Sequence, residues 1–163
     1  MKTVSFIAAK SGSGKTTLIE KIVPLLKARG LRVAVIKHAS KGFDLDRQGK
    51  DSWRFREAGA DTVLLVGPGG LALQQRLDSR PALADLERMA GNADVIITEG
   101  FKAEAKNRIE VFREGVSGER PLASSDASIL AIASDRRFDL GIPWLDLNDA
   151  AGVAAFIASK LQL

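Results

Sequence analysis

An α/β fold with a mostly parallel sheet is predicted from the order of the apolar segments along the chain. A short apolar run over residues 1–9 is followed by a helical pattern over 15–29 and a second apolar run over 31–37. A helix that joins two strands in so short a distance makes a right-handed crossover between parallel strands. Further apolar runs and a Gly-Pro-Gly-Gly turn add more strands and one antiparallel hairpin. Because 163 residues suffice for one packed core, we expect a single domain spanning 1–163.

The first half of the chain is predicted to hold the opening strand–helix–strand unit and a long loop. Apolar side chains recur at helical spacing in the first helix, Pro24 is expected to kink it, and Gly30 stands where a left-handed cap is expected. Residues 38–50 are polar and glycine-bearing without a sustained period, and long loops of this kind are often functional. A short helix over 51–58 follows and is stopped by Gly59.

The second half is predicted to begin with the hairpin and then to continue the sheet. The turn residues 67–70 separate two strand-like runs, so these two strands are antiparallel. The stretch 115–125 is expected to be a mobile surface loop. The other elements are expected to be strands over 62–66, 71–77, 93–98, 108–112 and 129–133, a helix from 79 to Met89, and a final helix from Asn148 or Asp149 to Lys160.

Composition excludes several classes of protein and restricts the ligands. The chain has no cysteine, which excludes a disulfide-stapled scaffold and a thiolate metal site, so any metal would bind oxygen ligands. Its 24 Lys and Arg exceed its 20 Asp and Glu, and the net charge of +4 suits an anionic ligand or serves solubility alone. The first apolar run ends at Lys10, too early for a signal sequence or a membrane span, so we expect a cytoplasmic protein with no membrane partner. Basic residues interleave with acidic ones, which argues against nucleic acid as a partner.

A phosphate-binding loop is predicted between the first strand and the first helix. Residues 9–16, Ala-Lys-Ser-Gly-Ser-Gly-Lys-Thr, match the loop pattern with alanine in place of its first glycine. Gly12 and Gly14 let the backbone turn its N–H groups inward, and the helix start adds its positive dipole end. Lys15 would neutralise charge on the β- and γ-phosphates, and the Thr16 hydroxyl would bind Mg²⁺. We therefore expect a three-layer P-loop nucleotide-binding fold whose nucleotide-binding residues are Lys10, Ser11, Gly12, Ser13, Gly14, Lys15, Thr16 and Thr17.

A carboxylate at the end of a neighbouring strand is expected to complete the metal site. Glu99 follows the apolar run 95–98 and precedes Gly100. It would therefore lie at the carboxyl end of a strand, where ligands bind in open α/β sheets. Asp94 precedes the same run and would lie at the opposite edge, as a surface or capping residue.

Two further residues near this rim each have two readings. Lys10 has the spacing of an extra lysine that reaches a partner's nucleotide in one subclass of P-loop proteins, but Ser11 replaces the glycine of that subclass, which favours a solvated lysine. His38, the single histidine, falls at a strand end on the same rim. It could contact the substrate or tune Asp44 and Asp46, or it could be an ordinary polar loop residue.

Several segments occur together in the order found in one known family. The Gly-Lys-Asp-Ser segment at 49–52 and the Glu-Gly-Phe-Lys segment at 99–102 are specific, whereas the phosphate loop is generic. With Ile-Lys-His at 36–38 and Phe-Asp-Leu-Asp at 43–46, they resemble the molybdopterin-guanine dinucleotide biosynthesis protein B family over nearly the whole chain. The resemblance implies a GTP-binding accessory protein with weak GTPase activity, which assists the guanylyltransferase that joins GMP to molybdopterin. It also implies a homodimer, for which the hairpin at about 61–77 is the candidate dimerisation element.

The resemblance implies roles for residues outside the phosphate loop as well. Asp44 or Asp46 would order the attacking water or make a second-sphere metal contact. Asp135, after the strand 129–133, could accept hydrogen bonds from a guanine edge, although no Asn-Lys-x-Asp motif precedes it and the choice of GTP over ATP rests on the resemblance. Three basic residues would face a second anionic ligand, such as the molybdopterin phosphate, or be solvated at the rim: Lys50, Arg54 and Lys102.

Two other functions use the same phosphate loop. A small-molecule kinase would transfer the γ-phosphoryl group to a bound hydroxyl and would need a lid with clustered arginines. The best candidate for such a cluster, Arg136 and Arg137, sits beside a strand end and not in a long insertion. A nucleotide-gated binding module without useful turnover would act as a carrier or scaffold for the transferase.

Overall fold

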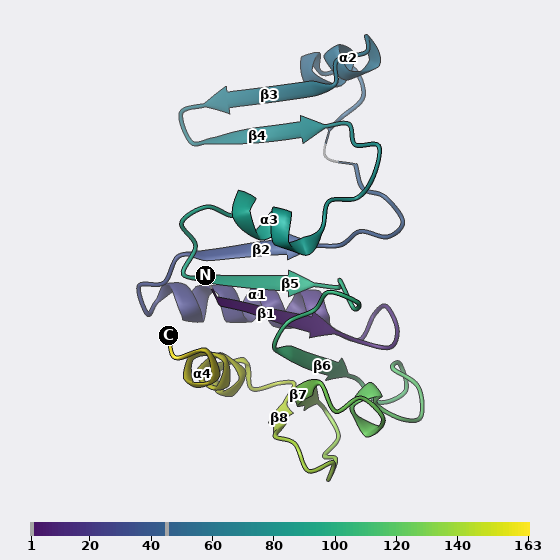
Figure 1. Cartoon of the computed structure of the whole chain (residues 1–163), viewed down its shortest axis with the longest axis vertical. Coiled ribbons are helices and arrows are strands. Elements are labelled where there is room, and N and C mark those ends of the chain that lie inside the picture. Colours follow the sequence, from purple (N-terminus) through teal and green to yellow (C-terminus); the bar gives the residue numbers. More distant parts are fainter. Residues whose placement is uncertain (1, 45) are drawn as a thin grey trace. The chain divides into compact units, whose positions relative to one another are not determined.

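The computed structural model describes residues 2–44 and 46–163 and divides into two compact units (Figure 1). The first unit comprises the residues up to His38 together with Ala82–Leu163, and the second comprises Ala39–Pro81. Within the part of the chain that is described, no helix is long and apolar enough to cross a membrane.

The first unit is built on a six-stranded sheet in which every pair of neighbouring strands is parallel. The strand order is β2-β5-β1-β6-β7-β8, so β1 lies in the interior of the sheet. The strands are β1 (Lys2–Ile7), β2 (Val33–Lys37), β5 (Val95–Glu99), β6 (Arg108–Phe112), β7 (Ile129–Ser134) and β8 (Trp144–Asp146). Glu99 is in register with Phe6 of β1 and Lys37 of β2, which brings the carboxyl ends of these three strands to one edge.

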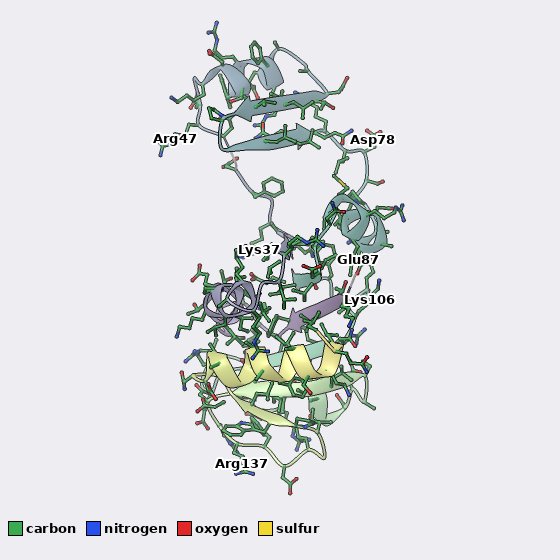
Figure 2. The ribbon with its side chains drawn as sticks, turned by 90° about the vertical axis from the view of Figure 1, so that its left-hand side faces the viewer. Lys37, Arg47, Asp78, Glu87, Lys106 and Arg137 are labelled. Atoms are coloured by element: carbon green, nitrogen blue, oxygen red, sulfur yellow. The ribbon has the colours of Figure 1, made fainter. Side chains whose placement is uncertain are left out.

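Helices on both faces of the sheet give this unit three layers. The helices are α1 (Lys15–Lys27), α3 (Leu83–Met89) and α4 (Ala150–Leu161). Figures 1 and 2 show α1 on one face of the sheet and α3 on the other. The apolar stripe of α1, including Leu18, Ile22 and Leu26, packs into a core with the sheet and α4. The predicted three-layer fold with a mostly parallel sheet is confirmed.

The second unit contains the predicted antiparallel hairpin. It consists of α2 (Asp51–Glu57), β3 (Thr62–Gly67) and β4 (Gly70–Gln75), and β3 pairs with β4 in antiparallel register. Val63 is buried, and α2 contacts β3. The cross-strand pairs Leu64–Leu73 and Val66–Leu71 are exposed. Successive strand residues point to opposite faces, so these two pairs share the face opposite Val63.

The helix α3 and the strand β8 differ from the prediction. The helix starts at Leu83 and not at residue 79, because Ala82 still has extended backbone angles and the Glu104 carboxylate accepts the Leu83 N–H at 2.6 Å. The strand β8 is only three residues long, too short for a periodic pattern to reveal it. At the other end of the unit, Asp149 caps α4 as expected and accepts the Gly152 N–H at 2.9 Å.

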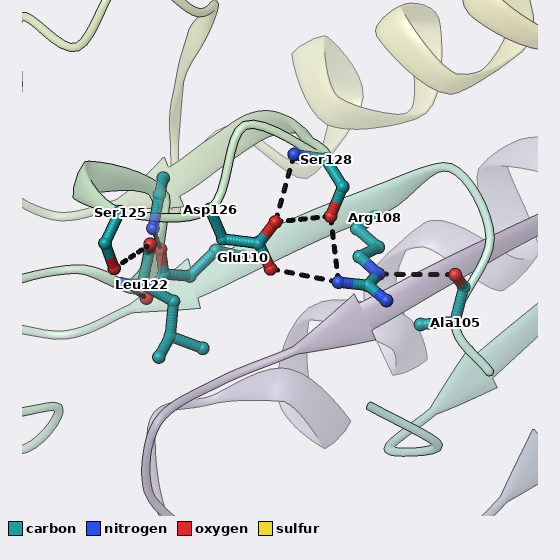
Figure 3. A network of polar contacts seen from close by, with 8 residues as sticks. Ala105, Arg108, Glu110, Leu122, Ser125, Asp126 and Ser128 are labelled. Carbon is teal, nitrogen blue, oxygen red and sulfur yellow. Dashed lines mark hydrogen bonds and ion pairs between the residues drawn. The ribbon is translucent and has the colours of Figure 1, made fainter. Parts of the chain in front are cut away.

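The segment 115–125 is anchored, contrary to the expectation of a mobile surface loop. The buried carboxylate of Glu110 accepts the N–H groups of Leu122 and Ala123, both at 2.8 Å, at the start of a short 3₁₀ turn. Figure 3 shows Glu110 and Leu122 beside a second contact, in which Arg108 donates to Asp126 at 2.9 Å. A loop whose backbone donors are satisfied by a buried carboxylate cannot be recognised from polar composition alone.

Candidate functional site

The loop between β1 and α1 has the geometry that its glycines predicted. Gly12 and Gly14 have φ angles of +79° and +94°, in the left-handed region that favours glycine. The Ser13 hydroxyl is buried and donates to the Lys10 carbonyl at 2.9 Å, which closes the loop. No acidic residue lies in the first turn of α1, so the positive end of a thirteen-residue helix is free to face an anion.

Thr16, Glu99 and Lys37 meet where the three strand ends converge. The Thr16 hydroxyl lies 3.0 and 2.9 Å from the two Glu99 carboxylate oxygens. The Lys37 ammonium lies 3.3 Å from the same hydroxyl and 3.3 Å from Glu99 Oε2. The predicted pairing of Thr16 with Glu99 is therefore present in the structure, and Lys37 is a third member that β2 contributes.

The oxygens of Thr16 and Glu99 suit a hard cation such as Mg²⁺. Among the described residues, no group of three His, Asp or Glu side chains is arranged to hold a metal ion. Mg²⁺ commonly keeps several waters and binds through one or two protein oxygens and substrate phosphates, so this donor set fits a metal that arrives with a phosphate ligand.

Lysine side chains give the loop a concentrated positive charge. Partial burial lowers the pKa of Lys15 below its usual 10.5; Glu99 opposes this shift, and Lys102 and Lys37 add to it. Lys102 also donates to the Ala9 carbonyl at 3.3 Å, which holds it at the start of the loop. The three ammonium groups repel one another, and a bound polyanion would relieve that repulsion.

The backbone bends sharply after Glu99. Gly100 has a φ of +95°, and a Cβ there would lie 3.1 Å from the His38 Cβ. Phe101 is buried although its φ is +54°, a conformation uncommon for a bulky residue. The His38 ring packs on Phe101 with 5.1 Å between ring centroids. The His38 backbone N–H donates to the Glu99 carbonyl at 2.9 Å. His38 thus helps to fix the bend that ends β5.

Asp135 lies at the end of β7 as predicted, beside a residue that sequence reasoning missed. Its Oδ1 accepts the Glu114 N–H at 2.9 Å, and its Oδ2 lies 3.6 Å from the Arg113 guanidinium. Arg113 Nη2 lies 3.2 Å from the position that a Cβ on Gly14 would occupy. A basic residue directly after a strand could have been noted in the sequence, but its closeness to the loop depends on β6 being the neighbour of β1.

Four of the predicted residues belong to the second unit. Lys50 precedes α2 as its N-cap, and Arg54 pairs with Asp51 at 3.7 Å on the helix surface. Asp46 Oδ1 accepts the Arg47 N–H at 2.9 Å, whereas its Oδ2 is buried and has no hydrogen-bond partner among the described residues. The roles expected for these three residues and for Asp44 stay predictions, as does the role of the exposed Lys10.

A family model and two matches over most of the chain point to the same family. Residues 4–135 match the family described as molybdopterin guanine dinucleotide synthesis protein B. The molybdopterin-guanine dinucleotide biosynthesis adapter protein of Escherichia coli is 39% identical, over 95% of this chain and 91% of that protein. The protein of the same name from Haemophilus influenzae is 36% identical, over 96% of this chain and 88% of its own length.

A solved structure extends the similarity to three dimensions. The crystal structure of a molybdopterin-guanine biosynthesis protein B superposes with a TM-score of 0.76 and 32% identity, covering 98% of this chain and 99% of that one. Both the sequence and the fold therefore match over nearly the full length. The chain belongs to the molybdopterin guanine dinucleotide synthesis protein B family.

Proposed function

We propose that this chain is a GTP-binding accessory protein with weak GTPase activity, which assists the guanylation of molybdopterin. The family gives the pathway, molybdopterin guanine dinucleotide biosynthesis. The observation that carries nucleotide binding is the set of three lysines around the loop at the start of α1: Lys15, Lys37 and Lys102. Their charges surround the point where backbone N–H groups at a helix start favour phosphate.

Different residues of the site would bind different parts of a nucleoside triphosphate. The loop backbone and Lys15 bind the phosphate chain, and Thr16 and Glu99 hold Mg²⁺. When bound, Mg²⁺ neutralises charge on the phosphate oxygens. Lys37, which contacts the same Thr16 and Glu99 oxygens, would add its positive charge beside a phosphate held at the loop.

The remaining assignments concern the attacking water and the base. We propose that Asp44 or Asp46, from the polar loop after β2, orients the water. Asp135 accepts from the guanine edge, and among the described residues its Oδ2 makes a long ion pair of 3.6 Å. Lys50 and Arg54 would supply positive charge to a second anion such as the molybdopterin phosphate.

Removing the charge of Lys15 tests the nucleotide site. We expect Lys15→Ala to weaken the binding of Mg²⁺–GTP by roughly 100-fold or more, because hydrogen bonds to charged groups contribute about 1.5–3 kcal/mol each and Lys15 also supplies long-range attraction. Titration calorimetry measures the affinity. Lys160→Ala, which removes the same charge from the last turn of α4, is the matched control and should bind as the wild type does. Unchanged affinity in Lys15→Ala would sink the proposal.

A GTPase releases the γ-phosphate as inorganic phosphate, whereas a kinase transfers it to an acceptor, so the labelled product distinguishes the two functions. Labelled GTP incubated with molybdopterin should release inorganic phosphate slowly and leave no phosphorylated acceptor. A labelled acceptor would establish the kinase instead. Retention of the guanylyltransferase in a pull-down, compared between GTP and GDP, tests the nucleotide-gated module, which requires retention to differ between the two nucleotides.

We also propose that the chain forms a homodimer through the uncovered face of the hairpin. Leu64, Val66, Leu71 and Leu73 form a contiguous exposed apolar patch on two paired strands. An isolated two-stranded hairpin is only marginally stable in water, and an apolar sheet face gains by packing against another. A second copy of this patch is self-complementary, as a twofold interface requires.

A further inference from the structure

The turn that follows β6 lies against the phosphate loop. β6 is parallel to β1, with Glu110 in register with Ile7, so the chain leaves both strands at the same edge. Val116 Cγ1 lies 3.7 Å from the position that a Cβ on Gly12 would occupy. The Arg113 guanidinium lies even closer to Gly14, with Nη2 at 3.2 Å and Nε at 3.6 Å from the corresponding position.

Two buried serines lock this turn to the loop. The Arg113 N–H donates to the Ser117 hydroxyl at 2.8 Å, and the Ser117 N–H donates back to the Arg113 carbonyl at 2.9 Å. The Ser117 hydroxyl donates to the Ser13 hydroxyl at 3.0 Å, and Ser13 donates to the Lys10 carbonyl at 2.9 Å. Both hydroxyls are buried, so the chain of bonds fixes the Arg113 backbone relative to the loop.

The guanidinium itself is only loosely held. Among the described residues, its ion-pair partner is Asp135, at 3.6 Å, which is longer than a hydrogen bond. The other Asp135 oxygen is taken by the Glu114 N–H at 2.9 Å. The Arg113 side chain is 38% exposed. A guanidinium has five N–H donors in a planar fork that matches the oxygens of a phosphate, so this side chain has donors to spare beside an anion site.

We propose that Arg113 is a nucleotide-contacting residue, whose guanidinium donates to the phosphate chain of the nucleotide held at the 9–16 loop. Asp135 orients the guanidinium from one side, and the Ser117–Ser13 bonds fix its backbone from the other. The inference rests on the proposed nucleotide site and deepens it, because it adds an arginine to the phosphate contacts of Lys15. Since Asp135 is also the proposed acceptor for the base, one carboxylate would link recognition of the base to placement of the arginine.

Affinities for GTP and guanosine in Arg113→Gln test the phosphate contact. We expect Mg²⁺–GTP to bind about 10–100-fold more weakly, and guanosine, which has no phosphate, to bind as it does to the wild type. Arg113→Lys keeps the charge without the fork and should recover part of the loss. Arg29→Gln removes an exposed arginine after α1 and is the matched control, expected to leave both affinities unchanged. Both ligands are measured by competition with a fluorescent guanine nucleotide.

Chemical modification of the wild type gives a second measurement that does not depend on a variant folding. Phenylglyoxal modifies exposed arginines, and peptide mass spectrometry reports each site. We expect Mg²⁺–GTP to slow modification at Arg113 at least tenfold and to leave Arg29 unaffected. Equal rates at Arg113 with and without GTP would overturn the inference, as would an Arg113→Gln variant that binds GTP as Arg29→Gln does, or that loses GTP and guanosine equally. Absence of GTP binding by the wild type would instead overturn the nucleotide site itself.

Discussion

Glu110 is a buried carboxylate that stabilises the loop after β6. It lies in β6 in the middle of the sheet, and its two oxygens accept the Leu122 and Ala123 N–H groups. Burial raises the pKa of Glu110 above its usual 4.5, although the two backbone N–H groups and Lys102 oppose the shift. The side chain therefore anchors the 115–125 segment, and burying its carboxylate away from water costs desolvation free energy.

Glu110→Gln is expected to lower the free energy of unfolding by about 1–3 kcal/mol at pH 4.5, because its amide NH₂ faces a backbone donor that loses its acceptor. The raised pKa means that the stability contributed by Glu110 is present at low pH and declines as the pH rises through that pKa. The difference in free energy of unfolding between variant and wild type should therefore become smaller toward pH 7. Urea unfolding at both pH values measures it, and Glu114→Gln, on the exposed side of the turn, is the control. A gap that widens with pH would contradict this account.

The pKa of Asp94 is shifted downward, opposite to the shift of Glu110. The Arg32 guanidinium and the Arg32 backbone N–H donate to its carboxylate and hold the pKa of Asp94 at about 2, below its usual 3.8. This pair joins the amino ends of β2 and β5, at the edge away from Glu99, where the sequence had placed Asp94. It is a surface contact that positions strand ends and takes no part in the site.

A depressed carboxyl pKa contributes stability above the unfolded pKa and loses it as the pH falls through the folded value. We therefore expect the wild type to lose stability between about pH 4 and pH 2 faster than Asp94→Asn does, because the variant no longer titrates there. Thermal unfolding across this range measures the slopes. Asp139→Asn, an exposed aspartate without this arginine, should follow the wild type. Parallel curves for wild type and Asp94→Asn would show that the pair does not persist in solution.

At the scale of the elements, the hairpin β3–β4 carries exposed apolar side chains that a second copy of the chain could cover. Val66 is 81% exposed and is paired across the strands with Leu71 at 67%. Leu71→Lys would place a charge in the centre of the proposed interface, where burial without a partner is unfavourable. We expect it to weaken dimerisation at least 100-fold, measured by analytical ultracentrifugation. Ala72→Lys, exposed on the opposite face of the same strand, should remain dimeric, and a monomeric wild type would refute the interface.

Element boundaries followed from the sequence where a periodic pattern or a distinctive turn was present. The hairpin could be predicted because its turn is rich in glycine and proline, and α1 because its apolar side chains repeat with helical period. The start of α3 could not, since a carboxylate twenty-one positions further along the chain, Glu104, satisfies its first N–H. The anchoring of 115–125 depends likewise on a distant buried side chain, Glu110.

At the scale of the whole molecule, the same reasoning predicted only part of the site. Thr16 and Glu99 could be expected to meet, because parallel strands deliver their carboxyl ends to one edge. Arg113 could not be found in this way. The sequence does not say on which side of the growing sheet a strand adds, and only the observed order puts β6 beside β1 and Arg113 beside Gly14.

The strand order also determines when this chain can begin to fold during synthesis. Among the described residues, β1 pairs with β5 and β6 alone and β2 with β5 alone, so neither early strand has a partner until Val95 and its successors have left the ribosome. The hairpin β3–β4, in contrast, joins neighbouring residues and can close as soon as it emerges. The nascent chain therefore displays two unpaired apolar strands and an apolar hairpin before its main core exists, a period in which protection by a chaperone would favour its yield.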